Sequence, residues 1–208
     1  RDRSVSRGLG DVYKRQLGNS TKVTYFSMGK DTSISQESYD RMTMYIGASG
    51  WGEFIIGEEP EIIKLQPDEL LIVPAGTLCG MQTSNGIVYT EIICTGKDIN
   101  MNANVKTNEV FALKNLISYE EGSIANMDVV STPDMKYVLM AFDEGTGLTP
   151  HRAPGNAIVF ALEGKATIGY EGKDYELSEG ECFRFEKNGL HSVTANGKFK
   201  MALLLVLE

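Results

Sequence analysis

The chain has 208 residues, a formal net charge of −8 at pH 7, 42% hydrophobic residues and 23% charged residues, a composition typical of a protein that buries a core. The acidic balance excludes nucleic-acid binding through clustered Lys and Arg and disfavours anionic membrane surfaces. No apolar run approaches the roughly 18 residues of a membrane span, and the chain starts without a secretory pattern, so we expect a cytoplasmic protein. Cys79, Cys94 and Cys182 are widely spaced and form no Cys-x-x-Cys pair, which argues against a disulfide framework or a Cys-rich zinc site.

The first sixteen residues differ in composition from the rest of the chain. Residues 1–16 (RDRSVSRGLGDVYKRQ) carry five basic and two acidic side chains and have no apolar period. The segment resembles a translated adapter or read-end sequence, so we expect it to be non-native or disordered, the alternative being a native basic tail. Without its charge of +3, the total of −8 becomes −11.

From residue 17 onward, short apolar or alternating stretches are separated by Gly, Asn and Asp. KVTYFSM, ELLIVP, IVYTEIIC and AIVFALEG are examples, and helical periodicity is weak and confined to TNEVFALKNLISY. This pattern predicts an all-β sandwich or barrel.

An internal repeat predicts two domains. LQPDELLIVPAGTLC, from Leu65, aligns without a gap with LSEGECFRFEKNGLH, from Leu177, at an offset of 112 residues. The segment that starts at Met28 aligns with the segment that starts at Phe142 at an offset of 114 residues. Two copies of one β unit explain these matches. We expect the boundary in the Asn-rich stretch 100–106, with an N-terminal domain over 17–105 and a C-terminal domain over 106–208.

The second copy carries spacings that resemble the two sequence motifs of the cupin family. Gly145, His151 and Gly164 fit the first motif, and Gly180 and His191 fit the second. With the repeat, the chain resembles a two-domain cupin, or bicupin, over nearly its whole length after residue 17. The resemblance implies two tandem cupin barrels of the double-stranded β-helix, or jelly-roll, type.

The resemblance also implies a site in the C-terminal barrel. In cupins that bind metal, two His and one Glu of the first motif and one His of the second converge on one ion. His151 and His191 keep two of these positions, whereas Ala153 and Ala157 occupy the other two. We therefore expect these four residues to line a ligand-binding pocket, with His151 and His191 as the candidate metal ligands.

In the N-terminal copy the same intervals select Glu37, Tyr39, Thr43 and Cys79, and this copy has no histidine. The resemblance places these four residues in the equivalent pocket. Two plainer interpretations stand beside it: Cys79 as a small buried apolar residue, and Glu37 as an exposed strand residue.

The resemblance leaves the reaction open, including whether the protein is an enzyme, because one fold hosts many functions. The favoured hypothesis is a small-molecule-binding protein that uses the C-terminal pocket, since half of the metal ligands are replaced. The alternative is a metal-dependent enzyme of the dioxygenase, isomerase or lyase type, in which His151 and His191 hold Fe, Mn, Zn, Ni or Cu. A third hypothesis gives the N-terminal barrel a structural or dimerising role, and the family resemblance favours a homodimer.

Overall fold

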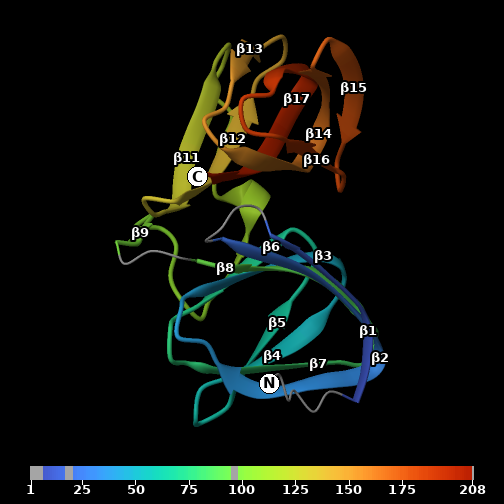
Figure 1. Ribbon diagram of the computed structural model, residues 1–208, viewed down its shortest axis with the longest axis vertical. Coiled ribbons are helices and arrows are strands. Elements are labelled where there is room, and N and C mark those ends of the chain that lie inside the picture. The colour runs from blue at the N-terminus through green and yellow to red at the C-terminus, as the bar shows by residue number, and fades with distance from the viewer. Residues whose placement is uncertain (1–6, 17–20, 95–97, 208) are drawn as a thin grey trace. The chain divides into compact units, whose positions relative to one another are not determined.

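The computed structural model describes residues 7–16, 21–94 and 98–207, with side chains from residue 21 onward (Figure 1). These residues form two compact units, one with a 9-stranded sheet and one with an 8-stranded sheet. The fold is all-β as expected, and each sheet curves into a barrel. The only helix in the described part of the chain is a 3₁₀ turn, η1 (Leu113–Asn115). No helix among these residues is long and apolar enough to cross a membrane.

The N-terminal sheet, blue to green in Figure 1, has the strand order β10-β6-β3-β8-β2-β7-β4-β5, and β1 pairs with β2 outside this path. Its apolar core includes Phe54, Leu65, Leu71 and Met81. The strands are β1 (Arg7–Gln16), β2 (Lys22–Ser38), β3 (Thr43–Gly50), β4 (Gly52–Ile56), β5 (Glu61–Leu65), β6 (Glu69–Val73), β7 (Leu78–Thr83), β8 (Ile87–Ile93) and β10 (Val110–Ala112).

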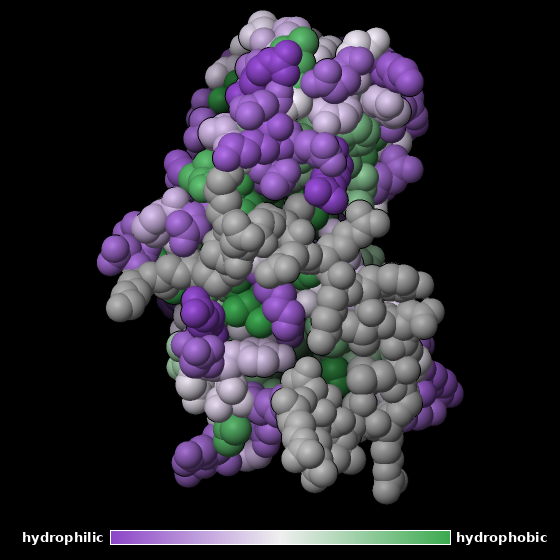
Figure 2. All heavy atoms as spheres, viewed as in Figure 1, coloured by the Kyte–Doolittle hydropathy of each residue, from purple (hydrophilic) through white to green (hydrophobic). Residues whose placement is uncertain are grey.

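The C-terminal sheet, yellow to red in Figure 1 except for the green β9, has the order β15-β14-β17-β12-β11-β9, with β13 paired to β17 and β16 paired to β14. Phe142, Val159, Phe185 and Phe199 belong to its core. On the face seen in Figure 2, hydrophilic residues cover most of this unit. The strands are β9 (Asn100–Met101), β11 (Ile124–Ser131), β12 (Met135–Phe142), β13 (Gly147–Arg152), β14 (Asn156–Tyr170), β15 (Lys173–Ser178), β16 (Cys182–Phe185) and β17 (Leu190–Val206).

Two short strands, one on each side of residue 105, each belong to the sheet of the other domain and not to the sheet that we expected. β9 precedes the expected boundary but pairs with β11 of the C-terminal sheet. β10 follows the boundary but pairs with β6 of the N-terminal sheet. Each strand supplies backbone partners to a sheet edge that would otherwise leave its N–H and C=O groups unpaired. The division between the units therefore does not fall at one point in the sequence.

The N-terminal segment also differs from what the sequence predicts. Residues 7–16, which we expected to be non-native or disordered, form β1 and pair antiparallel with β2. β2 is 17 residues long, and the backbone groups along its edge offer a template for a further strand. A non-native origin stays a prediction, and residues 1–6 lie outside the described residues.

The sequence repeat recurs in the backbone conformation. Gly50 and Gly164, 114 positions apart, both have positive φ, +67° and +77°. A Cβ on either would lie 2.1 Å from a backbone carbonyl oxygen, that of Gly86 or that of Lys198, so both positions require glycine. Four more pairs of positive-φ residues recur at the same or nearly the same offset: Asp31 and Gly145, Asp68 and Gly180, Gly76 and Asn188, and Gly86 and Gly197.

Candidate functional site in the C-terminal barrel

His151 on β13 and His191 on β17 face each other across two paired strands. Their Cα atoms are register partners, and the ring centroids are 4.3 Å apart at an interplanar angle of 51°. Between the pair Leu148 and Val193 and the pair His151 and His191, β13 advances three residues while β17 advances two. This bulge shifts the side-chain alternation by one residue and turns His151 to the same face as Leu148 and Val193, which pack against the core. The bulge therefore aims His151 at His191.

Both imidazoles are held in the same way. His151 Nδ1 lies 2.9 Å from the carbonyl oxygen of Thr149, and His191 Nδ1 lies 3.0 Å from that of Gly189. A carbonyl oxygen only accepts, so Nδ1 carries the proton in each neutral ring and Nε2 keeps its lone pair. Because both backbone hydrogen bonds involve Nδ1, the Nε2 atoms of both rings remain available as acceptors.

Burial separates the two histidines. His191 is 7% exposed and stacks on Phe185, with centroids 4.2 Å apart and planes at 25°, whereas His151 is exposed. Burial lowers the pKa of His191, the hydrogen bond to Gly189 opposes this, and the charge of His151 lowers it further. His191 is therefore biased toward the neutral form, which accepts at Nε2.

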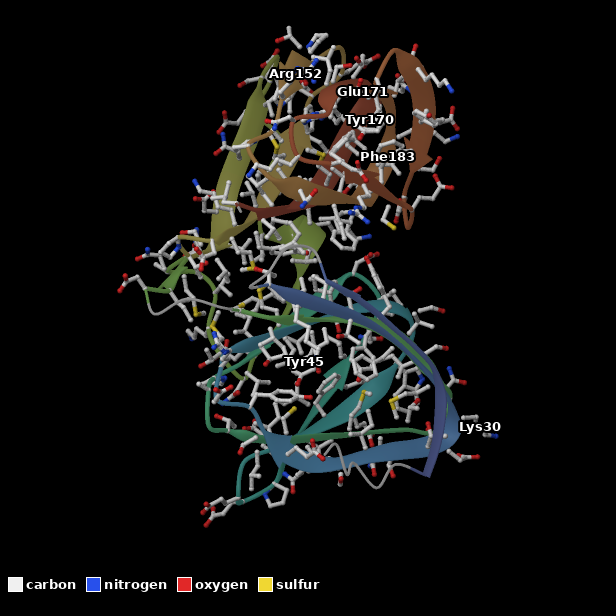
Figure 3. All side chains as sticks on the ribbon, in the orientation of Figure 1. Lys30, Tyr45, Arg152, Tyr170, Glu171 and Phe183 are labelled. Carbon is white, nitrogen blue, oxygen red and sulfur yellow. The ribbon has the colours of Figure 1, made fainter. Side chains whose placement is uncertain are left out.

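An aromatic wall continues from the histidines toward solvent. Phe185 lies 5.2 Å from Phe183 and 5.6 Å from Tyr170, and Phe183 lies 5.1 Å from Tyr175, measured between centroids. Tyr175 is 40% exposed. Figure 3 shows Tyr170 and Phe183 together within the C-terminal unit. The wall gives the site a surface suited to a planar apolar group.

Polar groups form the rim of this site. Arg152 donates to the carbonyl oxygen of Asn188, and its Nη1 lies 3.8 Å from the Glu171 carboxylate. Glu171 also accepts a hydrogen bond of 2.6 Å from the backbone N–H of Leu190. Glu171 and Gly172 both have positive φ and join β14 to β15 in a two-residue hairpin, the conformation of a type I′ turn. The hairpin therefore fixes the carboxylate that orients Arg152 (Figure 3).

The described side chains do not provide a full metal-ligand set. Ala153 is 8% exposed and Ala157 is 1% exposed, and Ala157 packs in the core cluster that contains Phe185. Among the residues with described side chains, no three His, Cys, Asp or Glu groups converge in a way that could hold a metal ion. A catalytic zinc site keeps three protein ligands. The two imidazoles alone do not fit that requirement.

In the N-terminal barrel the structure brings the expected residues together only in part. Glu37 and Cys79 are register partners, and a bulge between Ile34 and Glu37 matches the one before His151. Glu37 is nevertheless exposed, Cys79 is half-buried, and Thr43 is 2% exposed. Glu37 thus has the exposure of an ordinary strand residue. Burial raises the pKa of Cys79 to about 11, against a hydrogen bond from Tyr45 that lowers it, so its thiol stays protonated at neutral pH.

Tyr39, by contrast, contacts a residue that sequence reasoning missed. Its hydroxyl donates a hydrogen bond of 3.4 Å to the Glu91 carboxylate, and Glu91 is 4% exposed. Glu91 pairs in register with Tyr45, whose ring belongs to the core of this barrel (Figure 3). Alternation along IVYTEII places Ile87, Tyr89 and Glu91 on one face. This period-2 signal could have identified Glu91 as an interior carboxylate.

Other site residues lacked a usable signal. Arg152 and Glu171 meet only because β13, the β14–β15 hairpin and β17 converge, and Phe185 reaches His191 from another strand. None of these pairs has a characteristic spacing in the sequence.

Comparison with known protein families identifies the class of the second unit. Residues 138–207, about a third of the chain, match the Cupin domain family. This range contains His151 and His191 and most of the eight-stranded sheet. The C-terminal unit is thus a cupin domain, as the motif spacings predict. No curated protein matches the chain significantly.

Solved structures extend the similarity to both units. A Cupin 2 conserved barrel domain protein from Leptotrichia buccalis is 25% identical, with a TM-score of 0.82, and the alignment covers 94% of this chain and 88% of that one. Salicylate 1,2-dioxygenase from Pseudoaminobacter salicylatoxidans, in a structure with gentisate adducts, is 9% identical with a TM-score of 0.68, covering 90% of this chain and 68% of that one. At 9% identity the similarity to the dioxygenase shows the fold alone.

Proposed function

We propose that the C-terminal barrel binds a small planar organic molecule at the His151–His191 pair and uses no resident metal. The observation that carries this proposal is the hydrogen bond that each ring makes through Nδ1. Both Nδ1 atoms are hydrogen-bonded to backbone carbonyls, and both Nε2 atoms keep a lone pair. Two neighbouring acceptors recognise a hydroxyl or N–H donor on a ligand.

The surroundings favour a ligand with a flat apolar body. Tyr170 and Phe183, which are partly exposed, form an aromatic surface around the buried Phe185, and a ring stacked on such a surface gains both burial and favourable ring geometry. Arg152, held near Glu171 at 3.8 Å, adds a guanidinium donor at the rim. A few placed polar groups on an apolar wall are typical of small-molecule sites.

We further propose that the chain is a bicupin in which the metal-binding motifs of both barrels are degenerate. The recurring positive-φ positions and the matched bulges support two copies of one barrel. The replacement of ligand positions by Ala153 and Ala157 in one copy, and by Tyr39 and Thr43 in the other, supports the loss of the family's metal site in each.

Histidine-ring NMR with two probes of nearly equal shape, phenol and anisole, tests the proposed function. Phenol donates a hydrogen bond and anisole does not, so phenol is expected to shift the Nε2 resonances of His151 and His191 at lower concentration. His151→Ala and His191→Ala should each remove the preference for phenol. Thr194→Ala changes an exposed residue of the same strand β17 and should leave the preference intact.

Metal analysis by mass spectrometry on protein purified without a polyhistidine tag completes the test. Metal well below one equivalent per chain is expected. Stoichiometric metal that is lost in His151→Ala would contradict the metal-free site. Equal affinity for phenol and anisole would contradict the role of the Nε2 acceptors.

A further inference from the structure

The outer face of the N-terminal barrel has a polar hollow with a cavity volume of about 350 Å³. Asp31 and Glu53 contribute carboxylates to its lining, Gln82 contributes an amide, and Ser and Thr residues complete it. None of the described residues that line it is apolar or basic. The volume lies at the lower end of the range of about 300–1,000 Å³ that is typical of small-molecule sites. The hollow therefore suits a small polar ligand.

Four paired strands place a row of polar side chains at this hollow. Ser33 of β2 pairs with Gln82 of β7, Gln82 pairs with Glu53 of β4, and Glu53 pairs with Lys64 of β5. Register partners share a face of the sheet, and Phe54, the next residue along β4, belongs to the core on the opposite face. The row therefore faces outward, and its first three members line the hollow.

Hydrogen bonds hold the lining in place before any ligand binds. Gln82 Nε2 donates a hydrogen bond of 2.8 Å to Glu53 Oε2, so the Gln82 Oε1 atom remains an acceptor. Thr83 Oγ1 donates to the carbonyl oxygen of Trp51 at 2.7 Å and accepts from the N–H of Gly86 at 2.9 Å. The Asp31 carboxylate has no hydrogen-bond or ion-pair partner among the described residues. Groups that are already positioned lose little conformational entropy on binding.

The equivalent surface of the C-terminal barrel has smaller, uncharged residues. Three lining positions differ between the repeats, at offsets of 112 or 114 residues: Gln82 and Thr194, Glu53 and Thr167, and Asp31 and Gly145. Asp31 has a φ of +58°, a conformation that costs an aspartate more than a glycine. The fold therefore does not require the carboxylates and the amide at these positions, and a binding role is a physical reason for them.

The donors and acceptors of the lining select the chemistry of the ligand. Carboxylates only accept hydrogen bonds, whereas Ser and Thr hydroxyls both donate and accept, so the lining fits a ligand with several neighbouring hydroxyls. Two ammonium groups flank the hollow. Lys30 precedes Asp31 and lies on the outside of the barrel (Figure 3), and Lys64 is the register partner of Glu53. Because these charges offset the two carboxylates, a neutral ligand is favoured over a cation, and the carboxylates disfavour an anion.

We propose that this hollow is a second binding site, which takes a neutral saccharide. Neighbouring hydroxyls of a pyranose ring donate to the Asp31 carboxylate and to Glu53 Oε1, and such hydrogen bonds to a charged acceptor are strong. Gln82 Oε1 accepts a further hydroxyl, and the Ser33 hydroxyl exchanges a hydrogen bond with the ring substituents. The site lies on the outer face of the N-terminal barrel and does not depend on the site proposed in the C-terminal barrel.

Saturation-transfer NMR with three methyl pyranosides tests the proposal: methyl β-D-glucopyranoside, methyl β-D-galactopyranoside and methyl α-D-mannopyranoside. At least one of them is expected to bind with a Kd of about 1 mM or lower. Tetrahydropyran-2-methanol keeps the six-membered ring and the hydroxymethyl group but lacks the ring hydroxyls. It should bind at least about tenfold more weakly than that pyranoside, because it leaves the carboxylates without donors.

Two conservative variants test the role of the carboxylates. Asp31→Asn and Glu53→Gln should each weaken binding of that pyranoside by about tenfold, because each replaces a charged acceptor with a neutral amide. Asparagine tolerates a positive φ and glutamine has nearly the shape of glutamate, so both variants should fold. Glu61→Gln removes an exposed carboxylate of β5 that does not line the hollow. This control should change the Kd by less than about twofold.

Hydrogen exchange with mass spectrometry on the unaltered chain locates the site even if a variant fails to fold. The bound pyranoside should protect Leu78–Thr83 of β7 and should protect no strand of the C-terminal barrel. The proposal is overturned if none of the three pyranosides binds, if both carboxylate variants fold and bind normally, or if protection is confined to the C-terminal barrel. Calcium chloride is the probe for a cation site, and calcium binding without pyranoside binding would also overturn the proposal.

Discussion

The C-terminal barrel exposes two polar side chains of its candidate site, whereas the N-terminal barrel buries a carboxylate and a hydroxyl. His151 and Arg152 are exposed, while Glu91 is 4% exposed and Thr24 is 1% exposed. Yet the two barrels have equivalent bulges: one brings His151 into register with His191, and the other brings Glu37 into register with Cys79. The backbone thus specifies where side chains meet, and it leaves their chemistry free to diverge.

The two barrels also differ in the chemistry of these side chains. The C-terminal site presents two imidazoles beside an arginine. The N-terminal interior instead holds a carboxylate that accepts a hydrogen bond from a phenol.

The largest expected effect is a gain of bound metal in the C-terminal barrel when the missing metal ligands are restored. Ala153→His combined with Ala157→Glu adds an imidazole and a carboxylate to His151 and His191, which restores all four ligand positions of the family motifs. The variant should gain close to one divalent metal per chain, measured by mass spectrometry. Because Ala157 is 1% exposed, the added side chain should also destabilise the metal-free form by about 1–3 kcal/mol.

The matched control for this variant is the same double substitution with His151→Ala, which should bind metal weakly. A folded double variant that stays metal-free would show that these positions do not converge as the motif spacing implies.

The next largest effect concerns Cys79, which occupies the position equivalent to His191. Its pKa is raised to about 11 from the ordinary value of 9.0, chiefly by burial. At pH 8 the reactive thiolate should thus be about 100-fold scarcer than in the unfolded chain. Alkylation by iodoacetamide, followed peptide by peptide with mass spectrometry, should be slower by a similar factor than in urea. Equal rates in the two states would place Cys79 in an open, solvated position.

The smallest expected effect is a pH dependence carried by His191. Its pKa is lowered in the folded protein by burial, so the unfolded chain takes up a proton near the ordinary value of 6.5 while the folded chain does not. The free energy of unfolding should consequently fall as the pH drops below 6.5. Urea unfolding at pH 7.5 and pH 5.5 measures this fall, which should be smaller in His191→Gln. The same fall in both proteins would mean that other groups carry it.

Much of the fold could be predicted from the sequence because the repeat is long and its turns are specific. The alignment of Met28 with Phe142 indicated two β units, and the paired glycines Gly50 and Gly164 have the same left-handed conformation. The motif spacing also identified His151 and His191, which the structure brings to 4.3 Å between ring centroids.

The remainder could not be predicted because it depends on contacts between distant strands or on very short elements. Glu91 has no motif, and although alternation along Ile87–Ile93 places it on the face of Tyr89, its pairing with Tyr45 and Thr24 depends on two other strands. β9 has two residues and β10 has three, too few for any periodicity. Their pairing follows from the sheet edges available to them.

Because β9 pairs with the C-terminal sheet and β10 with the N-terminal sheet, the two domains cannot be separated by one cut in the chain. A cut anywhere between these strands, such as one at residue 105, would leave β9 on the N-terminal fragment and β10 on the C-terminal fragment. Each fragment would then lack one short strand of its own sheet and carry one that belongs to the other. The exposed edges of β6 and β11 would be free to associate with other chains. Independent expression of either barrel therefore requires a design that restores its missing strand, because no single break in the chain yields two complete sheets.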